Sequence, residues 1–342
     1  MRRLLVLALG FALVFGVVTA GAPAREAAAV EKTALVPVTV PSQRLVANDE
    51  FVLNLKGDWP PEALRAAEAA ASNLASQIKV KVPVEVELTW EPLDDFLGLG
   101  GASRSLINFP GAPKEGTWYP ISLANQLAGR RLGSGPDVEV SMNSTSHWDY
   151  SGEPQKAFKA GRPDFVTTVM HEILHGMAFL GTADVVDGLG RWGDEDGESE
   201  PERKVTLHRH CHCAAVSPLR VRGASAMTAV SADVYELFVA DGEGELMVEL
   251  DFENPSEELA DFLQSDDLFW KGPKGLAANG GKPVKLYAPE EWEAGSSYSH
   301  LDDETYDGGA NALLTSAGED IPNVKLGALI LGMLADMGWS VE

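Results

Sequence analysis

The sequence predicts an α+β fold, with a twisted sheet and covering helices in the N-terminal half and a mainly helical or irregular C-terminal half. Two observations predict it. Up to residue 180, short segments of alternating polar and apolar residues are interleaved with segments whose apolar residues recur every three or four positions. After Gly181, Gly and Pro clusters separate short apolar segments. Hydrophobic residues make up 45% of the 342-residue chain, which is enough for a sizeable core.

Alternating side chains predict the strands of the N-terminal half, because every second residue of a half-buried strand faces the core. The predicted strands are 50–55, 82–90, 105–109 and 138–142. A helix is predicted at 61–78, where Pro61 suits the first turn and one face is apolar. A shorter helix is predicted near 121–127. This order indicates a strand–helix–strand layout covered by helices.

The next predicted helix, 163–180, carries His171-Glu172-Ile173-Leu174-His175, the most informative motif in the chain. A spacing of four places both imidazoles on one helix face, where they can share a tetrahedral zinc ion. Glu172 then lies beside the water that the zinc would carry, as a general base requires. The alternative is a buried helix whose two histidines merely find hydrogen-bond partners. We predict His171 and His175 as metal ligands and Glu172 as the catalytic base.

A third zinc ligand is expected, because catalytic zinc normally takes three ligands from the protein. Of the other histidines, His147 stands in a polar stretch typical of a surface loop. His300 follows a loop of small residues and precedes Asp302 and Asp303, whose carboxylates could orient its second ring nitrogen. His300 is the best candidate. A carboxylate third ligand is the alternative, supplied by Asp184, Asp187 or Glu236.

The C-terminal half has weaker periodicity. Helices are predicted near 230–239 and 259–269. A last helix, near 324–337, presents an apolar stripe and ends at Gly338. Because that stripe needs a core to pack against, we expect this half to fold back beneath the motif helix.

Together these motifs resemble the leishmanolysin-like branch of the metzincin zinc peptidases, and are more similar still to uncharacterised secreted bacterial relatives of that branch. The segments that carry the resemblance are 164–179, 299–302 and 334–339, with weaker similarity at 116–125, 137–144, 277–281 and 286–289. The resemblance covers the chain from about residue 50 to the C-terminus. It implies a metzincin-like two-lobed zincin, whose third histidine is displaced by a long insertion after the active-site helix, where His300 stands.

The resemblance also implies domain boundaries. The N-terminal catalytic lobe is expected at 50–181, ending in the motif helix, and the C-terminal lobe at 182–342, with an inserted loop at about 193–229. Three features depart from the family pattern: the insertion itself, Ala178 where members have a Gly that turns the chain under the metal, and Leu314 where a methionine floors the metal site. A side chain at 178 is unfavourable if the turn needs a positive φ. Leucine fills a volume similar to methionine.

The N-terminal residues predict export. Arg2 and Arg3 precede an apolar run and then small residues, which is typical of a signal peptide at 1–22. Residues 23–49 are expected to be a linker or short pro-segment. The run is too short to span a bilayer comfortably, although a retained N-terminal anchor is the alternative. We expect a secreted, extracellular or periplasmic monomer without a stable membrane span after signal cleavage.

The net charge limits the classes of binding partner, and the cysteine content limits how the fold can be cross-linked. A formal net charge of −24 argues against nucleic acid and anionic membranes as partners. The two cysteines, Cys211 and Cys213, are one residue apart, so no disulfide framework is expected. With His208, His210 and His212 they form either an auxiliary metal site or a solvent loop.

The predicted function is that of a secreted zinc-dependent endopeptidase acting on protein or peptide substrates, with Zn²⁺ held by His171, His175 and His300. Two alternatives remain. One is a catalytically silent zinc-binding exported module, and the other is a zinc hydrolase with a carboxylate as its third ligand.

Overall fold

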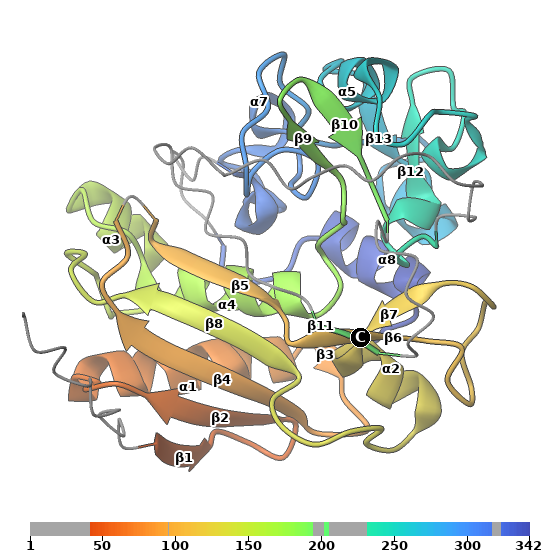
Figure 1. Cartoon of the computed structure of the whole chain (residues 1–342). Helices are drawn as coiled ribbons and strands as arrows, with labels where there is room; N and C mark the ends of the chain where they lie inside the picture. The colour runs from red at the N-terminus through yellow and green to blue at the C-terminus, as the bar shows by residue number, and fades with distance from the viewer. Residues whose placement is uncertain (1–41, 95, 194–201, 205–230, 317–322) are drawn as a thin grey trace, which may run out of the picture. The chain divides into compact units, whose positions relative to one another are not determined.

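The computed structural model describes residues 42–94, 96–193, 202–204, 231–316 and 323–342 (Figure 1). The predicted signal peptide, residues 23–41 of the predicted linker and the cysteine–histidine cluster at 208–213 lie outside the described residues, as does most of the predicted insertion. The described end of the predicted linker is not all linker, because Ser42–Val46 form a strand. Among the described residues no helix has both the length and the apolar character needed to cross a membrane.

A mixed five-stranded sheet forms the N-terminal half, in the order β1-β2-β4-β8-β5 (Figure 1). Its strands are β1 (Ser42–Val46), β2 (Phe51–Lys56), β4 (Val84–Glu91), β8 (Val138–Asn143) and β5 (Gly98–Ala102). The central strands β2, β4 and β8 are parallel, whereas β1 and β5 are antiparallel edge strands. The chain is therefore a mixed structure of sheet and helices, compatible with the predicted α+β class.

Two helices, α1 (Pro61–Ala75) and α4 (Phe165–Gly176), pack against each other, and α4 also packs against β5 and β8. Alternation explains the sheet's buried face: Val84, Val86 and Leu88 of β4 are fully buried, and the residues between them are not. α1 joins the parallel strands β2 and β4, as a parallel pair requires a crossover. The helix predicted at 61–78 ends at Ala75, because Ile78 and Lys79 form β3, which pairs with β15 (Ser340–Val341).

The remaining elements of this half are short. α2 (Ile121–Ala128) agrees with the predicted helix, and β6 (Arg104–Ile107) with the predicted strand. β6 joins β7 (Trp118–Pro120) and β11 (Glu202–Lys204) in a three-stranded sheet. α3 (Pro154–Lys159) precedes the motif helix.

The C-terminal half begins with a hairpin of β9 (Asp184–Val186) and β10 (Leu189–Arg191). A second small sheet joins β12 (Val239–Asp241), β13 (Leu268–Trp270) and β14 (Val284–Lys285). The other elements are helices and 3₁₀ turns: η1 (Glu236–Phe238), η2 (Met247–Glu249), α5 (Glu257–Leu263), α6 (Pro273–Ala278), α7 (Asp303–Tyr306), η3 (Ala312–Leu314) and α8 (Ala328–Met337).

Two predicted helices of this half were partly wrong. Over 231–239 the chain forms the 3₁₀ turn η1 and then enters β12, and of 259–269 only the first part is helical, in α5. Short apolar runs do not distinguish a helix from a buried strand by periodicity. Here Val239 and Ala240 are buried in a sheet with Leu268 and Trp270, so pairing between distant segments determines that these residues form strands. The last helix begins at Ala328 rather than near 324.

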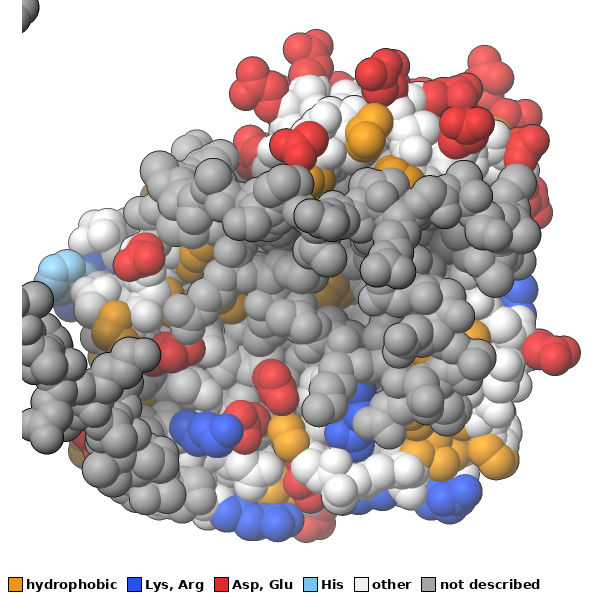
Figure 2. Space-filling model, in the orientation of Figure 1, with side chains coloured by type: hydrophobic (Ala, Val, Ile, Leu, Met, Phe, Trp, Pro, Cys, Tyr) orange, Lys and Arg blue, Asp and Glu red, His pale blue; other side chains and the backbone are white. Residues whose placement is uncertain are grey.

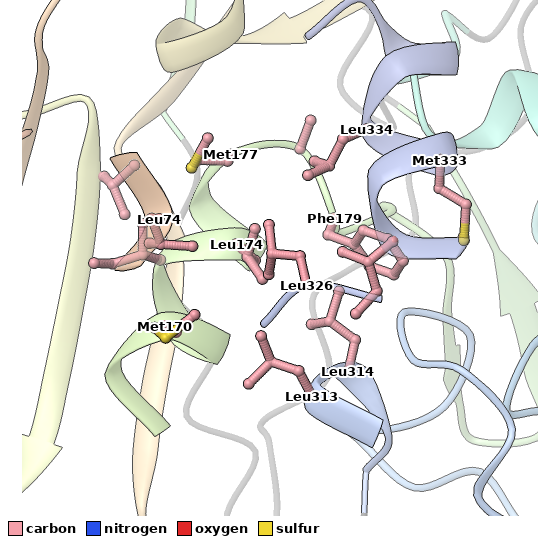
Figure 3. Packing of buried hydrophobic residues seen from close by; sticks show 14 of the residues in the cluster. Leu74, Met170, Leu174, Met177, Phe179, Leu313, Leu314, Leu326, Met333 and Leu334 are labelled. Carbon is pink, nitrogen blue, oxygen red and sulfur yellow. The ribbon is translucent and has the colours of Figure 1, made fainter. Parts of the chain in front are cut away.

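A continuous core links the motif helix to the C-terminal half (Figure 3). Met170, Leu174 and Met177 of α4 and its exit belong to one cluster with Leu314 of η3 and Leu334 of α8. Trp339 follows α8 and donates its indole N–H to the Met177 carbonyl at 2.6 Å. The C-terminal half therefore folds back against the motif helix, as the apolar stripe of α8 predicted.

Acidic side chains are unevenly distributed over the surface (Figure 2). Exposed carboxylates include Glu257, Glu258 and Asp261 of α5. In Figure 2 such groups cluster at the top of the view, where Figure 1 shows α5 and the neighbouring small sheet. A surface of this sign attracts cations and repels anions.

Candidate metal centre

The motif helix α4 is held firmly at its first turn. The Asp164 carboxylate accepts a hydrogen bond of 2.8 Å from the Thr167 backbone N–H, which caps the helix. Almost every residue of α4 is buried, so the helix has little freedom to move relative to the core. His171 and His175 lie one turn apart on it, as the four-residue spacing predicted.

Three imidazoles converge at one point. His171 and His175 approach each other with their Nε2 atoms 2.9 Å apart, and the Nε2 atom of His300 lies 3.1 Å from that of His171. The candidate ligand atoms of all three lie within 4.8 Å of one another. Two nitrogens on one tetrahedral zinc ion, at Zn–N distances of about 2.0–2.1 Å, would be about 3.3 Å apart. The three histidines are therefore close enough to hold one metal ion.

The second nitrogen of each ring contacts a backbone carbonyl. His171 Nδ1 donates to the Leu313 carbonyl at 2.6 Å. His175 Nδ1 donates to the Phe179 carbonyl at 2.7 Å, and His300 Nδ1 donates to the Ser296 carbonyl at 2.7 Å. A carbonyl only accepts, so each Nδ1 carries the proton. Each Nε2 then directs a lone pair at the common point, which is the tautomer that metal ligation needs.

Burial keeps these rings neutral. It lowers the pKa of His171, and with the neighbouring His171 it lowers the pKa of His175 to about 3. Burial and the two other histidines hold the pKa of His300 well below its usual range. Neutral imidazole is the form that binds a metal ion. Three neutral lone pairs facing one another repel, and a cation between them would remove that repulsion.

The predicted role of Asp302 and Asp303 in orienting His300 was wrong. Asp302 caps α7 through the Thr305 N–H, and Asp303 accepts hydrogen bonds from the N–H and hydroxyl of Ser316. The Ser296 carbonyl performs the orienting role instead. Both carboxylates are engaged by Thr305 and Ser316, and the ring instead turns to the carbonyl four residues before it.

Carboxylates do not join the histidine cluster within the described part of the chain. Glu236 is fully buried and accepts hydrogen bonds from the Thr182 N–H and hydroxyl. Asp184 pairs with Arg191 at 3.0 Å, and Asp187 lies in the β9–β10 turn. His147 is exposed, as its polar surroundings predicted. Among the candidates considered, only His300 completes the group.

Glu172 lies between the two helical histidines and against the edge strand β5. The residue is 8% exposed, and burial raises the pKa of its carboxyl to about 8. A Cβ atom at Gly98 would lie 2.8 Å from Glu172 Oε1, and one at Gly100 would lie 2.2 Å from the Glu172 carbonyl oxygen. Only glycine permits so close an approach of the strand to the helix. β5 therefore forms one wall around the candidate base.

Ala178 turns the chain beneath His175. It is fully buried with φ = 102°, a conformation that disfavours side chains. The turn brings the next residue, Phe179, to the position where its carbonyl accepts the His175 proton. The turn therefore has the positive φ that disfavours a side chain, and an alanine occupies it.

Replacing Ala178 with Gly is expected to raise the free energy of unfolding. The backbone relief of about 1–2 kcal/mol exceeds the loss of one buried methyl group, about 0.8 kcal/mol, so a net gain of up to about 1 kcal/mol is expected. Urea unfolding of metal-free protein measures it. Ala124→Gly, at an equally buried position inside α2, is the matched control and should lower stability. A loss at both positions would contradict strain at Ala178.

The turn η3 packs against the motif helix, and Figure 3 shows its Leu313 and Leu314 in one group of buried side chains with Leu174. Leu314 is fully buried, and its carbonyl accepts the Leu301 N–H at 2.8 Å. Leu313 supplies the carbonyl for His171. η3 thus connects His171 with the chain next to His300. Tyr298, two residues before His300, is fully buried with its hydroxyl 3.9 Å from Met247 Sδ.

Sequence patterns did not reveal the carbonyls of Leu313, Phe179 and Ser296, because every residue carries a carbonyl. The cluster Gly98-Leu99-Gly100-Gly101 was a detectable signal, since glycines in a strand often mark a close backbone approach. No family model, curated protein sequence or solved structure matches the chain. The resemblance to metzincins therefore rests on the motifs of this chain alone.

Proposed function

We propose that the protein is an exported zinc-dependent endopeptidase. One observation carries the proposal: three neutral imidazoles present their Nε2 atoms to one point, with the Glu172 carboxyl adjoining in the motif helix. Tetrahedral nitrogen donors suit zinc, and three protein ligands leave a position for water. The N-terminal sequence, with Arg2 and Arg3 before an apolar run, supports export.

In the proposed reaction the zinc ion and the side chains of the protein have separate roles. A zinc ion bound here would lower the pKa of a water molecule toward neutrality and polarise the scissile carbonyl. Glu172 accepts the proton of the attacking water and later delivers it to the leaving amine. A positive charge beside Glu172 favours its carboxylate form, which offsets the effect of burial on its pKa. Leu313, Phe179 and Ser296 keep the three rings in the required tautomer.

The edge strand β5 offers a binding surface for an extended peptide. Within the described residues it is the last strand of the five-stranded sheet, and it lies against Glu172. An extended peptide can add to such an edge through main-chain hydrogen bonds, which are independent of its sequence. This arrangement supports peptide-bond hydrolysis over hydrolysis of a small molecule.

Three features of the fold support the proposed kinship with metzincins. The mixed sheet, the motif helix behind it and the later histidine from a C-terminal segment are those that the resemblance implies. We propose the two-lobed arrangement, with residues 50–181 and 182–342 as its lobes, on the same basis.

Purified protein without the N-terminal segment is expected to contain one zinc ion per chain and to cleave casein. A strong chelator should abolish cleavage, and added zinc should restore it, because the proposed reaction requires the ion. Elemental analysis and release of labelled peptides measure the two quantities. Stoichiometric zinc without cleavage of any unfolded protein would indicate the catalytically silent module instead. Absence of bound zinc would contradict both.

A further inference from the structure

A second concave site lies at the carboxyl ends of the parallel strands. It is an open pocket of about 630 Å³, and Asp58, Trp59, Trp90 and Tyr150 are among its lining residues. We name it the aromatic pocket. The histidines of the metal centre do not line it. Figure 1 shows this end of β4 and β8 on the side of the sheet where α3 lies. Crevices outside the carboxyl ends of parallel strands are frequent ligand sites.

The three aromatic rings of the pocket stand around a fourth, buried ring. Phe165, the first residue of α4, is fully buried, and its ring centroid lies 6.3 Å from Trp59, 5.9 Å from Trp90 and 5.2 Å from Tyr150. Trp59, Trp90 and Tyr150 are themselves only half-buried. The Trp59 indole N–H also donates to the Lys56 carbonyl at 2.8 Å. The rings are thus held in place and partly open to solvent before any ligand arrives.

The charges at the pocket are negative. Asp58 is exposed at its rim, and among the described residues that line the pocket none is basic. Glu62 of α1 lies close enough to Tyr150 to contribute, after burial, to raising the pKa of its phenol. The nearby Lys56 ammonium is engaged by Glu87 at 2.5 Å. The whole chain adds a formal charge of −24, which attracts cations from solution.

We propose that the aromatic pocket binds the cationic head of an arginine side chain presented by a peptide or protein. A guanidinium group is planar and weakly hydrated, so it stacks on indole faces while a carboxylate receives its N–H groups. An anion would find no positive charge among the lining residues, and a neutral apolar group would make no favourable interaction with the Asp58 carboxylate. A lysine ammonium has the same charge and should bind more weakly, because it is more strongly hydrated.

The test uses full-length mature protein carrying Glu172→Gln, so that no probe is cleaved, and requires no activity. The probes are capped pentapeptides of alanine with a central arginine, lysine or citrulline, which is the neutral isostere of arginine. Calorimetric titration up to about 10 mM peptide measures the dissociation constants. The arginine peptide is expected to bind at least about fivefold more tightly than the citrulline peptide, with lysine between them.

Variants locate the binding. Asp58→Asn is expected to weaken binding of the arginine peptide about threefold, and Trp90→Leu to abolish the preference over citrulline. Asp261→Asn, at an exposed carboxylate of α5, is the matched control and should change nothing. Thermal unfolding checks that Trp90→Leu still folds, and Asp58→Asn tests the pocket without disturbing packing. Equal affinity for arginine and citrulline, no binding at all, or unchanged affinity in Asp58→Asn would each overturn the proposal. A failure of zinc binding or casein cleavage would leave these results unaffected.

Discussion

Replacing Glu172 with Gln is expected to reduce casein cleavage by at least about 10²–10⁴-fold while leaving one zinc ion per chain. Glutamine has almost the same shape, so it fits between the helix and Gly98, but it cannot accept a proton. The substitution removes a carboxyl whose pKa burial raises to about 8, so it should not destabilise the fold. Steady-state cleavage rates and elemental analysis of the same preparation measure both effects.

A matched control separates the role of Glu172 from a general effect of charge. Glu258→Gln, at an exposed position of α5, makes the same chemical change far from the histidines in sequence and should leave the rate unchanged. Full activity in Glu172→Gln would remove this residue from the mechanism. Loss of zinc together with activity would instead assign Glu172 a role in holding the metal centre.

Replacing His300 with Ala is expected to have the second largest effect, on the affinity for zinc. The variant keeps only the two imidazoles on α4 as zinc ligands. Substitutions of residues that merely orient a ligand lower metal affinity about 10- to 100-fold, so loss of a ligand itself should lower it further. Competition with a chromogenic chelator measures the dissociation constant of zinc. Circular dichroism and thermal unfolding of the metal-free protein show whether the variant keeps its overall fold.

His147→Ala is the control for that experiment, because His147 is exposed and lies outside the histidine cluster. Its affinity for zinc should equal that of the unchanged chain. If His300→Ala retained the original affinity, another group would have to supply the third ligand, and the convergence of the three rings would be incidental. A change in metal-free stability alone, without a change in affinity, would assign His300 a packing role.

Much of the N-terminal half could be predicted because its elements are long and regular. β2, β4 and β8 alternate, and α1 and α4 repeat apolar residues at helical spacing. β5 was not predicted, because its glycines have low strand propensity and its place depends on contact with Glu172. In the C-terminal half, Val239 and Leu268 form strands because their two segments, β12 and β13, pair with each other. A local sequence pattern contains no information on such pairing.

The candidate site likewise has features that local sequence predicts and features that only tertiary structure determines. The four-residue spacing of His171 and His175 determined by itself that both rings share a face of one helix, because helical geometry is local. Only the tertiary structure decided that His300 reaches them, which partners fix the three tautomers, and that Ala178 adopts a positive φ. Those features depend on how α4, η3 and the loop before His300 pack together. Packing between segments distant in sequence depends on the whole chain rather than on any one stretch of it.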